Sequence, residues 1–167
     1  MKNDEIIKQL AKTGPGDSRD EVKEIKTKKF LIFQIKEKRY ALYAEQIREI
    51  IIDVPRFYVP FVPPYIRGFI NRHGEPYTII DINVLFENEI LDSSSYLILN
   101  IENDQAAILI TDVCEIIKIP ETEIHNITSR DEHHGYFSVS ISLNNSEIFV
   151  LNLQNILDKI SDDLGED

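Results

Sequence analysis

Short apolar segments separated by turns occupy most of this sequence, and they constrain its fold more than any other feature. About nine or ten of them lie between Phe30 and Asn152. They include KFLIFQI, YALYA, IRGFINR, PYTIIDI, SSYLILNI, QAAILIT, CEIIKI, YFSVSIS and EIFVLN. Segments of this length that are rich in Ile, Val, Phe and Tyr are typical of β-strands. Their regular spacing predicts a mainly β chain, folded as a sandwich or as barrels.

Three other segments depart from this pattern. Leu153, Ile156, Leu157 and Ile160 have the spacing of a C-terminal helix with one apolar face. Ile47 and Ile50 predict a short helix or helical turn within residues 44–50. Residues 54–65, VPRFYVPFVPPY, contain four prolines, which exclude a regular helix and a central strand. We therefore expect a rigid, extended connection there.

Net charge is −11 and unevenly distributed along the chain. Residues 1–28 sum to +1, residues 29–72 to +4 and residues 73–167 to −16. A chain with so large a negative charge repels nucleic acid and anionic membrane surfaces. The negative charge then has two interpretations: it keeps the protein soluble, or it docks the protein to a partner of complementary charge. No apolar run reaches the length of about 20 residues that a membrane helix needs, so we expect no membrane insertion. The single cysteine, Cys114, cannot form a disulfide within the chain, which favours the cytoplasm.

Catalytic motifs are absent from the sequence. There is no nucleophile elbow of the G-x-S-x-G type and no phosphate-binding glycine loop. We expect Cys114, between Val113 and Glu115 in an apolar strand, to be a core or half-buried residue. The spacing of His133 and His134 is not that of a structural zinc site. A small β-barrel metal protein or enzyme that uses His73, Asp81, His133 and His134 nevertheless stays open as an alternative.

Residues 68–81, GFINRHGEPYTIID, have the composition of a surface presented to another protein. Gly68 and Gly74 permit tight backbone geometry. Arg72 has a forked cation suited to binding a carboxylate. Bulky neighbours such as Tyr65 and Tyr77 are of the kind found at interface centres. The alternative interpretation is a pair of ordinary core strands with a surface turn.

The run VPPYIRGFINRHGEPYTIIDINVLF resembles the signature of the CheW-like domain of bacterial chemotaxis. The matching residues are Pro64, Ile66, Gly68, Ile70, Asn71, Gly74 and Asp81. Further resemblance lies in YALYAEQIREI, AAILITDVCEII and IFVLNLQNIL, so that it covers about residues 29–160. It divides the chain into a flexible N-terminal extension at 1–28, a CheW-like domain at 29–160 and an acidic C-terminal tail at 161–167.

The resemblance implies a fold, a role and a set of site residues. The fold would be two small, intertwined five-stranded β-barrels that share a core, with a short helix and a C-terminal helix. The role would be that of a non-enzymatic adaptor without a cofactor. It would couple the cytoplasmic tips of chemoreceptors to the regulatory domain of a CheA-type histidine kinase by scaffolding. The protein-binding residues would be Glu49, Gly68, Asn71, Arg72, His73, Gly74 and Asp81.

This chain departs from the family pattern at several surface positions. His73 stands where the family has an Arg before the glycine, Thr78 replaces a Pro, Asn83 replaces an Arg, and Thr111 replaces an Asp. The first change suggests two hypotheses. Either Arg72 takes over the role of the missing Arg, or the charge at this point becomes pH-dependent through His73.

Overall fold

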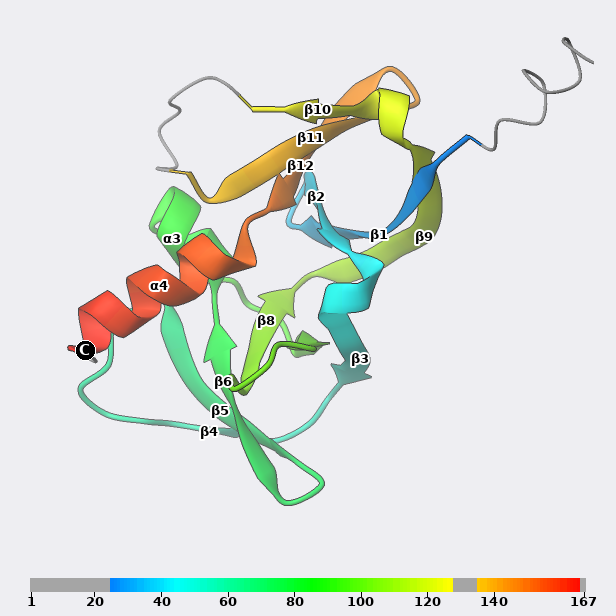
Figure 1. Ribbon diagram of the computed structural model, residues 1–167. Coiled ribbons are helices and arrows are strands. Elements are labelled where there is room, and N and C mark those ends of the chain that lie inside the picture. Colours follow the sequence, from blue (N-terminus) through cyan, green and yellow to red (C-terminus); the bar gives the residue numbers. More distant parts are fainter. Residues whose placement is uncertain (1–24, 128–134, 166–167) are drawn as a thin grey trace, which may run out of the picture.

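The computed structural model describes residues 25–127 and 135–165, which form two six-stranded sheets (Figure 1). The first sheet has the order β10-β11-β12-β2-β1-β9, and the second has the order β3-β7-β8-β6-β5-β4. The first contains β1 (Thr27–Ile35), β2 (Lys38–Tyr43), β9 (Asp112–Pro120), β10 (Ile124–Asn126), β11 (Phe137–Leu143) and β12 (Ser146–Leu151). The second contains β3 (Ile47–Ile52), β4 (Arg56–Phe57), β5 (Ile66–Arg72), β6 (Glu75–Ile80), β7 (Ser95–Leu99) and β8 (Ala106–Ile110).

The mainly β fold is confirmed, with one strand more per sheet than expected. The additional strands are short: β4 has two residues and β10 has three. Within the described residues, the helical elements are η1 (Ala44–Gln46), α3 (Ile82–Glu87), η2 (Glu121–Glu123) and α4 (Leu153–Leu164). The helical turn expected over residues 44–50 is therefore correct only for its first three residues. Ile47 and Ile50 lie in strand β3, where their exposure follows the two-residue period of a strand rather than a helix.

The chain crosses between the sheets twice, so that the two halves are interlocked. It makes β1 and β2 of the first sheet, then β3 to β8 of the second, then β9 to β12 of the first. Along β1, Leu31 and Phe33 belong to the core cluster shared with the second sheet, whereas Phe30 and Ile32 fill the interior of the first. Because both faces of β1 are buried, its sequence is a continuous apolar run instead of an alternating one.

Residues within the predicted apolar strands form the core. Fully or almost fully buried examples are Ile79, Ile80, Ile108, Ile110 and Val150. Cys114 was predicted wrongly, because it is exposed on β9. β9 lies at the edge of its sheet and pairs with β1 alone among the named strands, so much of its surface faces solvent.

Helix α4 follows β12 of the first sheet and packs its apolar side on the shared core (Figure 1). Asn152 caps its first turn by accepting a hydrogen bond from the amide of Asn155, and Gly165 ends it in the left-handed conformation. At its last turn, the Tyr65 hydroxyl donates to the Asp163 carboxylate at 2.6 Å. The helix includes residues 161–164, which the sequence assigned to the tail, and β1 begins two residues before position 29.

Candidate protein-binding surface

The hairpin of β5 and β6 presents the residues at the centre of the predicted site. Arg72 pairs with Glu75, so His73 and Gly74 form a two-residue turn. Both have positive φ, 53° and 82°, as a type I′ hairpin turn requires. Gly74 meets this requirement without strain, and His73 belongs to the residue types that tolerate this region. Asn71, His73 and Gly74 are exposed at the tip.

Arg72 is held against Glu49 of strand β3. Its Nε donates to Glu49 Oε2 at 3.0 Å, and its second terminal nitrogen donates to Oε1. β3 and β5 are not neighbours in the sheet order, so this two-pronged ion pair joins the hairpin to an edge strand. Both side chains are about one-third exposed. The hydrogen bonds and charge of Arg72, with a smaller contribution from His73, lower the pKa of the Glu49 carboxyl.

This arrangement bears on the two hypotheses for the altered motif. The structure places Arg72, and not His73, beside the acidic residue of β3. His73 occupies the turn itself and is exposed. Arg72, which is paired with Glu49, and the exposed His73 therefore lie next to each other on the hairpin.

Asp81 does not lie on this surface, contrary to the expectation that it contacts a partner. Its side chain is fully buried and forms an ion pair with Arg67 at 2.8 Å. It also accepts hydrogen bonds from the amides of Asn83, Val84 and Leu91, at 3.0, 3.3 and 2.9 Å. These bonds cap α3 and fix the loop that follows it. The role that the structure gives Asp81 is to hold the fold.

Gly68 is also buried, where no partner reaches it directly. Its φ is +106°, and a Cβ at this position would lie 2.0 Å from the carbonyl oxygen of Phe57. The register of β5 on β6 shifts between Ile66 and Phe69, around this residue. A glycine is required because the backbone of β4 passes too close for any side chain.

Two apolar residues at the edge of β3 belong to the exposed surface and were not predicted. Ile50 and Ile52 are 43% and 63% exposed, whereas Ile51 between them is buried. A strand alternates its faces, so three consecutive isoleucines must expose at least one when only one face is covered. The run of three isoleucines is therefore the sequence feature that could have predicted exposed apolar side chains on β3. We define the β3–hairpin surface as Glu49, Asn71, Arg72, His73 and Gly74. The alternation of β3 places Ile50 and Ile52 on the opposite face of the strand from Glu49.

The alternative metal site is not favoured by the positions of its residues. His73 precedes β6 and Asp81 follows it, so the six residues of the strand separate them by about 20 Å. The Asp81 oxygens are already occupied by four donors. His133 and His134 lie outside the described residues. Within the described ranges, no group of three or more His, Cys, Asp or Glu residues is close enough to hold a metal.

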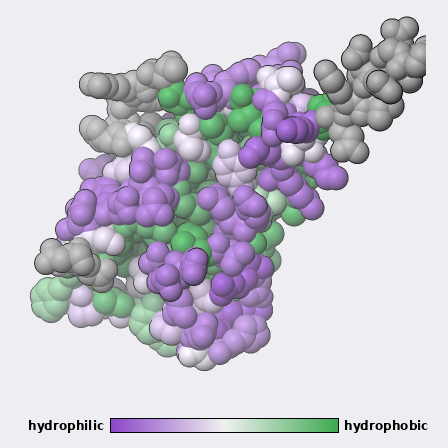
Figure 2. Space-filling view, in the orientation of Figure 1, coloured by the Kyte–Doolittle hydropathy of each residue, from purple (hydrophilic) through white to green (hydrophobic). Residues whose placement is uncertain are grey.

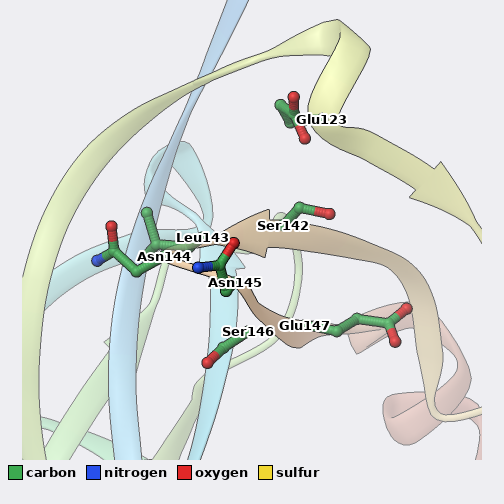
Figure 3. A pocket seen from close by; sticks show the side chains of 7 residues that line it. All are labelled: Glu123, Ser142, Leu143, Asn144, Asn145, Ser146 and Glu147. Carbon is green, nitrogen blue, oxygen red and sulfur yellow. The ribbon is translucent and has the colours of Figure 1, made fainter.

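A wide polar pocket of about 690 Å³ lies at the far end of the first sheet. Its lining residues come from η2 and the β11–β12 hairpin: Glu123, Ser142, Leu143, Asn144, Asn145, Ser146 and Glu147. Figure 3 shows Glu123 and Glu147 far apart across it, without convergence on one point. Desolvation is the largest cause that raises the pKa of the Cys114 thiol, which disfavours the thiolate form.

The groups that the structure brings together are a fixed ion pair, an exposed edge strand and a rigid hairpin tip. They define a protein-binding domain built on a double β-barrel. The chain belongs to the CheW-like domain family, because the family model matches residues 29–161. The resemblance noted in the sequence is thereby confirmed. No helix in the described parts of the chain is long and apolar enough to cross a membrane.

Individual proteins of known name agree with this assignment. The chain is 27% identical over 144 residues to the chemotaxis protein CheW of Bacillus subtilis (strain 168). This match covers 83% of this chain and 92% of the Bacillus protein. Its fold is similar to the crystal structure of the scaffolding protein TtCheW from Thermoanaerobacter tengcongensis, with a TM-score of 0.71. That match has 23% sequence identity and covers 76% of this chain and 90% of the other.

Proposed function

We propose that the β3–hairpin surface is a partner-binding face of a chemotaxis adaptor. The chain couples chemoreceptors to a CheA-type histidine kinase by scaffolding, a role supported by its family and by both named relatives. The single observation that carries the proposed location is the Arg72–Glu49 pair, which fixes the hairpin against an edge strand with exposed apolar residues. We assign the chain no catalytic role and place it in the cytoplasm.

The surface has the components that a specific interface needs. Ile50 and Ile52 expose apolar area on the opposite face of the same edge strand. Arg72 has its fork occupied by Glu49, so the pair presents a defined arrangement of charge rather than a mobile cation. Because the hairpin and β3 are held together in advance, little conformational entropy is lost when a partner docks.

The test compares single substitutions in their binding to a receptor-tip fragment and to the kinase, at about pH 6 and about pH 8. Arg72→Ala should weaken binding of at least one partner by about tenfold at both pH values, since it removes an interface Arg and releases Glu49. His73→Ala should have a smaller effect, visible mainly at the lower pH. Lys38→Ala is the matched control, because it breaks an exposed ion pair between Lys38 of β2 and Glu87 of α3. Helix α3 follows the C-terminal end of β6, whereas the hairpin turn lies at the N-terminal end of that strand.

Each outcome has a distinct meaning. If the parent chain binds both partners while neither hairpin substitution changes its affinity, the adaptor role stands and the proposed surface is wrong. If the parent chain binds neither a receptor nor a kinase, the adaptor role itself is refuted. Stoichiometric zinc or nickel in untagged protein would instead support the metal-protein alternative.

A further inference from the structure

Arg48 of strand β3 makes a second connection between this edge strand and the β5–β6 hairpin. Its Nη1 donates a hydrogen bond to the Tyr77 hydroxyl of β6 at 2.9 Å. β3 and β6 are not neighbours in the sheet order, so side chains and not a backbone ladder join them here. Figure 2 shows mainly hydrophilic, purple side chains over the end of the molecule that contains the hairpin, as expected for a connection between polar groups. The Arg48–Tyr77 contact is separate from the Arg72–Glu49 pair, which joins β3 to β5.

A β-bulge explains why two consecutive residues of β3 reach the hairpin. Successive side chains of a regular strand face opposite sides, so Arg48 and Glu49 would diverge. The pairing with β7 advances by two residues on β3, from Ile47 to Glu49, but by one residue on β7. Arg48 is therefore the extra residue of a bulge. A bulge redirects a side chain and is frequent beside functional sites, and here it lets Arg48 reach β6 while Glu49 reaches β5.

The two contacts lie on one face of the hairpin. Tyr77 is two residues from Glu75 along β6, and Glu75 pairs with Arg72 of β5. Residues two apart on a strand share a face, as do residues directly opposite each other, so Tyr77 and Arg72 project to the same side. A single contact would leave β3 free to pivot about it. Two contacts on one face fix the orientation of β3 relative to the hairpin.

Both ends of the Arg48–Tyr77 contact are held in place. Tyr77 is 4% exposed and belongs to the shared core. Nη2 of Arg48 donates to Asn100 Oδ1 at 3.3 Å, and the Asn100 side chain in turn donates to the Glu45 carbonyl at 3.2 Å. An ionised donor makes a stronger hydrogen bond than a neutral one, and a buried hydroxyl left without its partner is costly. The bulge is therefore fastened to a rigid point of the core.

We propose that Arg48 is a positioning residue for the β3–hairpin surface. It holds the bulge of β3 on the buried Tyr77, and this presents the neighbouring Glu49 to Arg72 in the geometry of their ion pair. Arg48 acts without touching a partner: it keeps the surface in its binding arrangement, which limits the conformational entropy lost on docking. This inference rests on the proposed function, because it concerns the same surface.

Tyr77→Phe and Arg48→Ala test the proposal in the full chain, with the receptor-tip fragment and the kinase as probes. Each should weaken binding of the partner that Arg72→Ala weakens, by about three- to tenfold. The double variant should be no weaker than Arg48→Ala, because both changes remove the same contact. Arg48→Lys retains a donor that can reach the hydroxyl, so it should restore part of the affinity. Arg39→Ala, which removes an exposed arginine from β2 of the other sheet, is the matched control and should change nothing.

An NMR titration of Glu49 adds a readout that a general loss of stability would not move. In the parent, the hydrogen bonds and charge of Arg72 lower the pKa of the Glu49 carboxyl. Tyr77→Phe removes a hydroxyl and keeps every charge. If the bulge loosens, the ion pair loses its geometry, so the pKa of Glu49 should rise towards its ordinary value.

The outcomes separate this inference from the proposed function. If Arg72→Ala weakens binding while Tyr77→Phe and Arg48→Ala do not, the surface stands and the positioning role is refuted. If all three variants bind like the parent, the proposed surface and the positioning role fail together. An unchanged pKa of Glu49 in Tyr77→Phe would also overturn the proposal, because the bulge would then keep its place without the hydroxyl.

Discussion

Replacing Asp81 by Ala should unfold the chain at a much lower temperature rather than merely remove a partner contact. The carboxylate is fully buried, pairs with Arg67 and accepts three backbone amides. Breaking a buried ion pair by removing one partner costs about 3–5 kcal/mol, and this range includes the helix cap of about 1 kcal/mol that is lost with it. We therefore expect a loss of about 4 kcal/mol, or about 8–16 °C in melting temperature for a chain of this size.

Thermal and urea unfolding measure this loss directly, with Asp81→Asn as the control. The asparagine keeps an oxygen that can accept the amides of Asn83 and Val84, but it loses the charge that faces Arg67. It should fall between the parent and Asp81→Ala. The reasoning is refuted if Asp81→Ala melts within a degree of the parent yet loses a partner, since Asp81 would then act at the surface.

The other predictions concern the close contact of β4 and β5, the core and the N-terminal extension. Gly68→Ala should cost about 2–4 kcal/mol by denaturant unfolding, because its Cβ would overlap the Phe57 carbonyl at a positive φ; a neutral result would mean that β4 moves freely. Ile80→Ala should cost about 2–5 kcal/mol, and a melting point within a degree of the parent would contradict its burial. Deleting residues 1–24 should leave the melting temperature unchanged, because their polar composition provides too little apolar surface for burial; a large drop would show that Ile6, Ile7 and Leu10 pack on the domain.

The strands could be predicted because buried strands have a distinctive amino-acid composition. Isoleucine, valine and aromatic residues occur in short runs between turns, and nearly every run became a strand. Composition does not reveal which face of a strand is left exposed to solvent. Cys114 and Ile116 look like core residues, but both lie on the exposed face of β9, where Ile119 alone is fully buried. Helix α3 was missed because six residues between two strands give too little periodicity to detect.

The candidate site was harder to predict because its residues come together only through the fold. The Arg72–Glu49 pair joins positions 23 residues apart across two strands that are not neighbours in the sheet. Arg67 and Asp81 are likewise brought together by the pairing of β5 with β6. Motif position alone placed Asp81 and Arg72 in one group, whereas burial separates a residue that holds the fold from one that faces solvent.

The interlocked path of the chain has a consequence for how the protein is made. β2 pairs with β12, so that Tyr40 lies beside Phe149, more than 100 residues later in the sequence. The first sheet cannot be completed on the ribosome while β12 is still inside the exit tunnel, whereas all strands of the second sheet, β3 to β8, precede it in the sequence. Completion of the first sheet then waits until β12 has emerged and proceeds through long-range pairing, which is intrinsically slow. Exposed strand edges during this delay would make the nascent protein a client for chaperones.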